Sequence, residues 1–218
     1  MSFWKAQADR IAKWGMLRTF NYYLFGVLLH KLGITICVGY RLDGEVRSAE
    51  PTAGTSLTTL RSWSDWTDRD LQVLQKCDDA SRLEVFRGYA AIGDECVVAR
   101  DQDGELAGYT WVGQRTKFPL ARGERMSYVH DGTIYPAHRG KGVFPILLAY
   151  ACACARNQQA EPLPIVADCL VVNYASRRGL MKAGFVPFGH ILRIRNWTWT
   201  WPSKAEGRPA RSYDVAAR

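Results

Sequence analysis

The sequence predicts a mixed α/β domain in which a central twisted mixed sheet is flanked by helices. β-rich runs alternate with helical patterns along most of the chain, and a glycine-rich turn joins one strand directly to a helix. The composition is globular, with 47% hydrophobic and 23% charged residues, and 218 residues fit one domain with an appendage. We therefore assign residues 1–50 to an N-terminal extension and linker, 51–202 to the α/β domain and 203–218 to a disordered tail.

The N-terminal extension is basic and rich in aromatic residues. Residues 1–42 contain six Lys and Arg residues and a single acid, Asp9. The longest apolar run, Tyr22–Leu29, is too short for a transmembrane helix. Such a segment can lie on an anionic membrane surface, which would place the protein peripherally on the inner face of the membrane. Packing on the domain, or on the second chain of a homodimer, remains an alternative.

Net charge and cysteine content narrow the class of protein. The net charge of +8 suits an anionic ligand, nucleic acid or an anionic membrane, and because no RNA-binding signature is present, nucleic acid is not favoured. The six cysteines form no CxxC pair and have no histidine at zinc-finger spacing. We therefore expect no metal site, reduced and buried thiols, and a cytoplasmic location.

The first half of the domain reads as a strand, two helices and a β-hairpin. Ser64 or Asp65 is the expected N-cap of the first helix, which runs to about residue 75. The turn sequence Asp101–Gly104 joins two β-rich runs into the hairpin. The expected elements are a strand at 56–61, helices at 65–75 and 80–90, and hairpin strands at 95–100 and 106–112.

The second half alternates strands and helices. Pro145 fits the first turn of a helix, where its missing N–H costs nothing, and Gly184 ends the last helix. The final strand places Trp197, Trp199 and Trp201 on one face, which we expect to pack against the N-terminal extension. The expected elements are strands at 126–135, 164–172 and 191–201 and helices at 143–157 and 175–183.

The glycine-rich turn at 135–144, YPAHRGKGVF, is the most informative stretch. A strand that ends in glycines and opens a helix exposes backbone N–H groups at the positive end of the helix dipole, where phosphate groups bind. Gly140 and Gly142 allow close approach of an anion, and Arg139 and Lys141 add positive charge. The stretch matches neither the nucleotide-triphosphate P-loop nor the dinucleotide fingerprint.

Two signatures in the chain resemble those of the GNAT superfamily of N-acetyltransferases. Residues 139–144 resemble its pyrophosphate-binding turn, [Arg/Gln]-x-x-Gly-x-[Gly/Ala]. Residues 173–185, NYASRRGLMKAGF, are similar to its second signature, in which Asn-x-x-[Ala/Ser] precedes Lys-x-Gly-Phe. The hairpin also looks like the second and third strands of that fold, so the resemblance spans about residues 55–201. The chain further resembles members associated with bacterial surface-glycan synthesis.

The resemblance implies acetyl-CoA or another acyl-CoA as cofactor, with its pyrophosphate on the turn and its pantetheine paired with the preceding strand. The cofactor-binding residues it implies are Ile134, Tyr135, Arg139, Gly140, Lys141, Gly142, Val143, Phe144, Asn173 and Ser176. Two positions depart from the family pattern. Phe144 replaces a small residue, and Leu180 stands where many members have a tyrosine that protonates the leaving thiolate.

Acyl transfer to an amine requires a base, and the strand before the turn offers two candidates. His130 has an imidazole that accepts a proton near neutral pH, and Tyr128 on the same strand face could relay it. Asp131 points to the other face unless a β-bulge re-aims it, and a water chain is the third alternative. A backbone N–H of Ile134 or Tyr135 is the expected donor to the acyl oxygen.

The sequence thus predicts an acyl-CoA-dependent N-acyltransferase. The expected reaction moves an acetyl group to a primary amine of a small molecule, including an amino sugar or glycan precursor. A non-catalytic acyl-CoA-binding or membrane-associated scaffold protein is the alternative, because no general acid is assigned.

Overall fold

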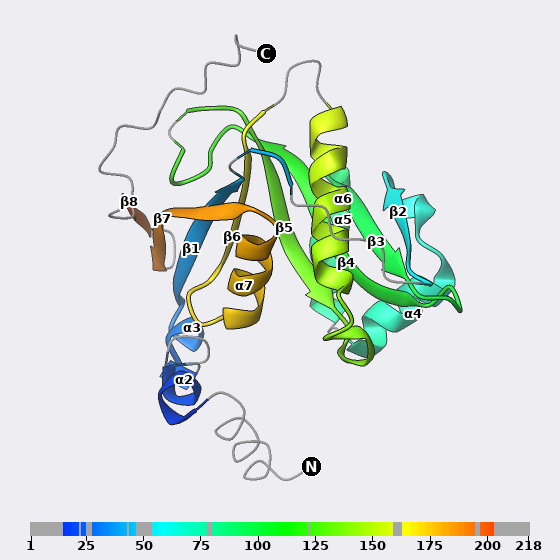
Figure 1. Ribbon diagram of the computed structural model, residues 1–218, viewed down its shortest axis with the longest axis horizontal. Coiled ribbons are helices and arrows are strands. Elements are labelled where there is room, and N and C mark those ends of the chain that lie inside the picture. The colour runs from blue at the N-terminus through cyan, green and yellow to red at the C-terminus, as the bar shows by residue number, and fades with distance from the viewer. Residues whose placement is uncertain are drawn as a thin grey trace.

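The computed structural model describes residues 15–21, 23–24, 28–42, 44–46, 54–77, 80–121, 123–158, 163–194 and 197–202. These residues form an eight-stranded mixed sheet flanked by helices, which confirms the predicted fold class (Figure 1). The expected tail at 203–218 lies outside the described residues, as does the beginning of the N-terminal extension.

The strands follow the order β2-β3-β4-β5-β6-β1-β7-β8 across the sheet. Among these neighbours only β5 and β6 run parallel. The strands are β1 (Ile34–Leu42), β2 (Ser56–Leu60), β3 (Glu95–Arg100), β4 (Leu106–Arg115), β5 (Met126–Ile134), β6 (Ile165–Leu170), β7 (Phe185–Ile194) and β8 (Trp197–Pro202).

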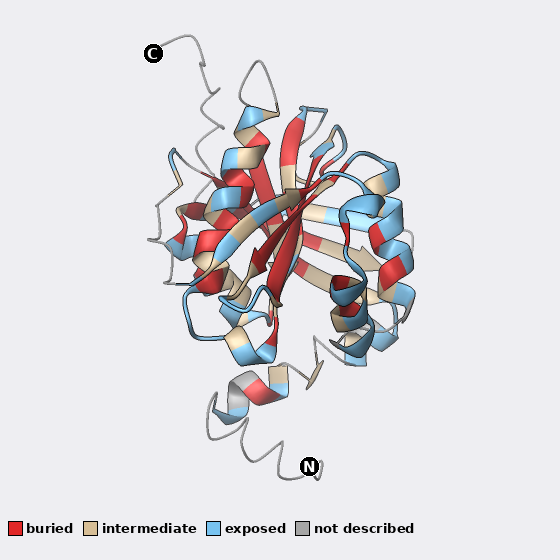
Figure 2. Ribbon diagram, turned by 90° about the vertical axis from the view of Figure 1, so that its right-hand side faces the viewer, coloured by how far each residue is buried: buried red, intermediate tan, exposed pale blue. Residues whose placement is uncertain are grey.

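Helices cover both faces of the sheet, and the buried residues gather between the layers (Figure 2). One face packs against α6 and α7 and the other against α4 and α5. The helices are α2 (Met16–Asn21), α3 (Leu29–Lys31), α4 (Asp68–Cys77), α5 (Ala80–Ala91), α6 (Val143–Asn157) and α7 (Tyr174–Lys182), with short 3-10 turns η2 (Trp63–Asp65) and η3 (Pro136–His138). The predicted limits of the helix at 143–157 are those observed for α6.

The two faces of the sheet have different cores. Small and aliphatic side chains such as Leu147, Ala151 and Cys152 of α6 fill the first core. The second is aromatic: the ring of Phe86 on α5 lies 5.3 Å from that of Trp111 and 5.0 Å from that of Tyr109, between ring centroids. Burial of each such ring contributes about 2 to 3 kcal/mol, so α5 is anchored firmly beside the centre of β4 and β5.

The strand β1 corrects the expected domain boundary. The expectation that residues 34–42 belong to the N-terminal extension is wrong, because β1 lies inside the sheet between β6 and β7. Its Tyr40 side chain is fully buried. No local pattern in the sequence indicates this position, because both partners of β1 lie more than 120 residues further along the chain.

The expected final strand at 191–201 is also wrong, because it consists of two antiparallel strands. The chain reverses after β7, so that Ile194 pairs with Trp197. An alternating pattern continues through the reversal and therefore resembles one long strand. The three tryptophans do share a face, and Trp197, Trp199 and Trp201 are 69%, 48% and 43% exposed. Trp201 stacks on the His190 ring of β7, with 5.5 Å between centroids, and the packing of these rings on residues 1–14 lies outside the described residues.

The N-cap of α4 differs from the expected Ser64 or Asp65. Thr67 and Asp70 bond each other reciprocally: the Asp70 N–H donates to the Thr67 hydroxyl oxygen at 3.2 Å, and the Thr67 N–H donates to the Asp70 carboxylate at 3.1 Å. Ser62 and Asp65 instead form a capping box on η2. The cap of η2 and the cap of α4 lie within a few residues of each other, and the sequence pattern does not show which residues cap which helix.

Candidate active site

A cavity of about 390 Å³ opens where β5 and β6 separate. The two parallel strands pair only from Ser127 to Val129 on β5, opposite residues 165–167 on β6. Beyond that point the strands diverge, and the space between them is lined from both faces of the sheet. Lining residues include Arg82 from α5, residues 129–133 from β5, residues 167–170 from β6, Phe144 and Leu148 from α6, and Asn173, Ser176 and Leu180 from the α7 region.

A β-bulge directs Asp131 to this cavity. Tyr109 pairs with Thr133 and Trp111 with His130, so β5 has one more residue than β4 over this stretch. Asp131 takes a left-handed backbone with φ of 53°, the only positive φ among the described non-glycine residues. Its carboxylate pairs with the Arg82 guanidinium of α5. The bulge considered from the sequence is therefore present, and Asp131 lines the cavity beside His130.

His130 belongs to a buried charged network. Its Nε2 lies 3.0 Å from a carboxylate oxygen of Asp94, and Arg115 donates to the other Asp94 oxygen at 2.8 Å. Burial raises the pKa of Asp94, but hydrogen bonds from Arg115 and His130 outweigh it and hold that pKa below its usual range. An ionised carboxylate only accepts hydrogen bonds, so Nε2 donates in this contact, which is shorter than the 3.4 Å between Nε2 and the Arg115 guanidinium. In that tautomer Nδ1 is the basic nitrogen of the neutral ring.

Tyr128 stacks on the His130 ring, with 4.8 Å between centroids and 10° between planes. Its hydroxyl donates to Asp168 on β6, which also accepts from Arg193 at 3.1 Å. Burial and the neighbouring Asp168 carboxylate raise the pKa of Tyr128 well above its ordinary value. The Tyr128 proton is therefore held by Asp168 rather than by His130.

The glycine-rich turn lies at the N-terminus of α6. Gly140 and Gly142 both have left-handed backbones, with φ of 79° and 78°. Gly142 is the N-cap, and no side chain caps the helix. The N–H groups of Val143 and Phe144 therefore lack acceptors within the helix, and the positive end of a 15-residue helix is left open to an anion.

The end of β5 before the turn has only one backbone edge that a ligand can pair with, because the other edge is bonded to β4. The Tyr135 N–H donates to the Ala107 carbonyl at 3.0 Å, so it is engaged with β4. Neighbouring residues of an antiparallel strand direct their backbone groups to opposite sides. The N–H and carbonyl of Ile134 therefore point away from β4, to the side of β5 where β6 no longer pairs with it. Its carbonyl accepts from Arg139 Nε at 2.8 Å.

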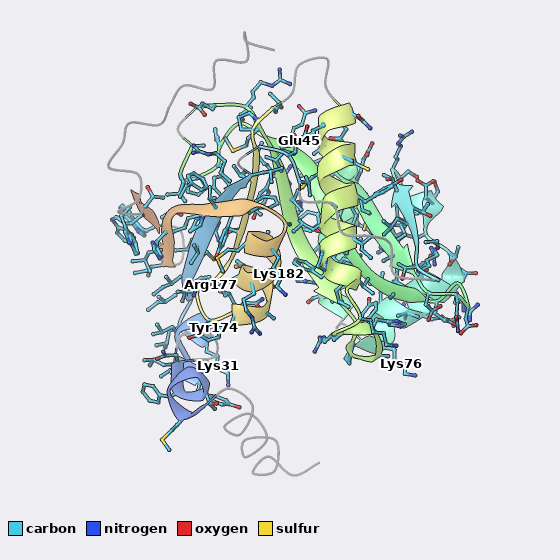
Figure 3. The ribbon with its side chains drawn as sticks, viewed as in Figure 1. Lys31, Glu45, Lys76, Tyr174, Arg177 and Lys182 are labelled. Atoms are coloured by element: carbon cyan, nitrogen blue, oxygen red, sulfur yellow. The ribbon has the colours of Figure 1, made fainter. Side chains whose placement is uncertain are left out.

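The residues of the second signature form the start of α7. Asn173 caps that helix, since its side-chain oxygen accepts from the Ser176 N–H at 3.1 Å. Arg177, which is labelled beside α7 in Figure 3, donates to the Tyr40 hydroxyl at 3.2 Å and to the Val171 carbonyl at 3.0 Å. These bonds connect α7 to the sheet. Ser176 lines the cavity, and Asn173 lines it as well.

Leu180 and Cys169 line the cavity, but neither can act as an acid or a base at neutral pH. Leu180 is 3% exposed and places an aliphatic side chain where a tyrosine is common in the family that the sequence resembles. Cys169 also lines the cavity, and burial raises the pKa of its thiol to about 12. That thiol is protonated at neutral pH and is a poor nucleophile.

Sequence reasoning missed the partners of the expected site residues. Arg82, Asp94 and Asp168 come from three separate elements, and each pairs with a charged or titratable group far along the chain. The only available signal was a charged residue next to an apolar run, which is common on solvated surfaces.

Comparison with protein families gives one match, the acetyltransferase (GNAT) family, over residues 60–185. No curated protein matches the chain. Among solved structures, a tandem GNAT protein from the clavulanic acid biosynthesis pathway is 19% identical with a TM-score of 0.53, covering 78% of this chain and 54% of that one. A GNAT-family acetyltransferase from Colwellia psychrerythraea is 13% identical with a TM-score of 0.55, covering 78% and 56%.

An aminoglycoside N-acetyltransferase in complex with CoA is 12% identical with a TM-score of 0.50, covering 64% of this chain and 92% of that one. At these identities the structures show a shared fold, and the chain spans about half the length of the first two. The family match covers more than half of the chain. The fold, the cavity between the separating strands and the turn before α6 agree with that match, and the chain belongs to the GNAT family of acetyltransferases.

Proposed function

We propose that the protein transfers an acyl group from acyl-CoA, with acetyl-CoA as the principal donor, directly to an amine. The observation that carries this proposal is the cavity between β5 and β6. It is lined by α6 and α7 on one face of the sheet and by Arg82 of α5 on the other, and His130 and Asp131 are among its lining residues. A donor and an acceptor can therefore meet there from opposite faces.

The residues around the turn fit the CoA part of the donor. The N–H groups of Val143 and Phe144 are uncapped, and the space beside Gly140 is open, since an added Cβ there would meet nothing within 4 Å. These groups, with Lys141, are suited to a pyrophosphate. The Ile134 carbonyl, which also accepts from Arg139, can take a second hydrogen bond from an amide N–H of pantetheine, in the way that a strand edge binds an extended peptide.

Direct transfer agrees with the chemistry of the lining residues. Bound acyl-CoA supplies an activated thioester; the new C–N bond forms as the C–S bond breaks, and CoA leaves as a thiolate. His130 takes the proton of the amine at Nδ1, while Asp94 holds the ring in the required tautomer. The Ile134 N–H donates to the acyl oxygen as negative charge develops on it.

The acceptor that best suits the cavity is a small molecule with a primary amine, such as an amino sugar or glycan precursor. The carboxylates of Asp131 and Asp168 line the cavity, and each is balanced by an arginine. They attract the ammonium form of the amine, and the arginines keep either carboxylate from being a buried unpaired charge.

Turnover of acetyl-CoA is the direct test. The full chain should release free CoA thiol, detected colorimetrically, when a panel of amino sugars, amino acids and polyamines is supplied. At least one amine should raise the rate well above hydrolysis without acceptor. Tight binding of acetyl-CoA with no turnover across the panel would contradict the enzyme and favour the non-catalytic acyl-CoA-binding or scaffold alternative.

We also propose that the part of residues 1–42 that precedes β1 holds the protein on an anionic membrane surface. In α2 the side chains of Met16 and Phe20 are 74% and 60% exposed, and Leu28 and Leu32 near α3 are 52% and 58% exposed. No described helix combines the length and the apolar character required to cross a bilayer. Exposed apolar groups beside basic residues fit interfacial binding instead.

A charge-reversal pair tests this proposal without disturbing β1, which a larger N-terminal deletion would remove. The variant Lys5→Glu/Lys13→Glu should bind anionic vesicles at least about 10-fold more weakly, since each basic residue near the surface contributes about 1 kcal/mol. The control Lys76→Glu/Lys117→Glu changes net charge equally on α4 and the β4–β5 loop. Co-sedimentation with vesicles measures binding.

An equal loss of vesicle binding in both variants would contradict a local membrane anchor. Dimers that form without vesicles, seen on a sizing column, would favour the alternative in which the segment makes a homodimer contact.

A further inference from the structure

The cavity has an apolar end and a polar end. Towards α6 and α7 most of the lining is aliphatic or aromatic, with the polar residues Asn173 and Ser176 at the start of α7; the apolar side chains are Val129, Phe144, Leu148, Ala167 and Leu180. Towards α5 it is lined by Arg82, His130, Asp131 and Asp168. The polar end suits an amine and its base, and the apolar end suits a hydrocarbon group.

Phe144 links the anion-binding turn to the reacting end of the cavity. It is the second residue of α6, so its N–H belongs to the turn. Its ring reaches the bulge of β5, where a Cβ added to Gly132 would lie 3.3 Å from a ring carbon. Gly132 directly follows Asp131, so the ring borders the place where acceptor and acyl group would meet.

The Phe144 ring is fixed in a notch made by two glycines. A Cβ built on Gly179 of α7 would overlap two carbons of the ring, and Gly132 closes the other side. The absence of a side chain at Gly179 is therefore what makes room for the ring. Phe144 also packs against the core cluster of the α6/α7 face, so the ring is a fixed wall and not a loose flap.

We infer that Phe144 closes an acyl pocket and limits the donor to short acyl chains. This inference rests on the proposed function, because it assigns the apolar end of the same cavity to the acyl group. With the ring in its notch, an acetyl group has space, whereas each further methylene must displace packed side chains. Replacing the ring by a methyl group opens the cavity along Gly132 and Gly179 and admits longer chains.

Calorimetry with CoA, acetyl-CoA, butyryl-CoA and hexanoyl-CoA tests the pocket on the full chain. The natural protein should bind acetyl-CoA at least as well as CoA and should bind butyryl-CoA more weakly. In Phe144→Ala the affinity ratio of butyryl-CoA to acetyl-CoA should rise at least about 10-fold, since each buried methylene is worth about a factor of four. Phe144→Leu, which keeps part of the wall, should give an intermediate ratio and serves if the alanine variant unfolds.

The outcomes separate the pocket from the catalytic proposal. If the ratio is unchanged in both variants, or if the natural protein binds all chain lengths equally, Phe144 does not limit the acyl group. If the ratio shifts as expected but no amine is acylated, the acyl pocket stands and the proposed enzyme activity fails. If acetyl-CoA is turned over while the ratio stays unchanged, the enzyme activity stands and the acyl pocket fails.

Discussion

Substituting Gly142 by aspartate is expected to weaken CoA binding by at least about 100-fold, to the limit of calorimetric detection. Gly142 is the N-cap of α6, and the proposed pyrophosphate site lies on the N–H groups that follow it. A carboxylate at this position repels the diphosphate and competes for the same donors. Its charge also favours a helix N-terminus, so the fold should survive and the melting temperature should not fall greatly.

Gly142→Asn is the matched control for this experiment. Asparagine has nearly the same shape as aspartate and tolerates the left-handed backbone that Gly142 adopts, at φ of 78°. The difference between the two variants therefore reports the charge alone. A second control, Gly104→Asp, places the same carboxylate on another left-handed glycine, in the β3–β4 turn. Equal CoA affinity in Gly142→Asp and the natural protein would show that the pyrophosphate does not bind at this turn.

Replacing His130 by glutamine is expected to lower kcat about 100-fold while the affinity for CoA stays within a factor of about two. The glutamine amide can still donate to Asp94, so the buried network with Arg115 keeps its hydrogen bonds. What the variant lacks is a nitrogen that accepts a proton. Steady-state kinetics with the best amine of the panel, together with calorimetry for CoA, measures both quantities.

Asp131→Asn distinguishes the two candidate bases. If His130 is the base, this variant should mainly raise KM for the amine, because Asp131 and Arg82 lie on the acceptor side of the cavity. Full activity in His130→Gln combined with complete loss in Asp131→Asn would make Asp131 the base. Full activity in both variants would indicate that a chain of water molecules, and neither side chain, takes the proton of the amine.

The parts of the fold that the sequence predicts well are those set by neighbouring residues. The helix at 143–157 is bounded by two glycines before it and by the end of its apolar pattern, and its limits are those observed. The hairpin of β3 and β4 follows from its turn sequence. Asn173 stands out by its position in a signature, and its observed role as a helix cap is equally local.

The features that sequence reasoning missed depend on partners distant in the chain. Nothing around residues 34–42 indicates that both edges of that strand will be paired, and the reversal at the end of β7 is hidden by an uninterrupted alternation. The same holds within the cavity. The tautomer of His130 depends on Asp94, 36 residues away, and the setting of Asp131 depends on a bulge and on Arg82, 49 residues away.

The place of β1 in the sheet imposes an order on folding during synthesis. This strand leaves the ribosome early, but its neighbour β6 is complete only after residue 170 and its neighbour β7 only after residue 194. At ordinary elongation rates the nascent strand waits roughly 6 to 26 s for its first partner and roughly 8 to 30 s until both edges can pair. Its sequence ITICVGYRL is apolar and β-prone, so it is open to wrong pairing with another chain during that interval. The last strands made thus complete a sheet that includes the first, and a ribosome stalled before residue 185 would carry a sheet in which β1 can pair with β6 but has its other edge exposed.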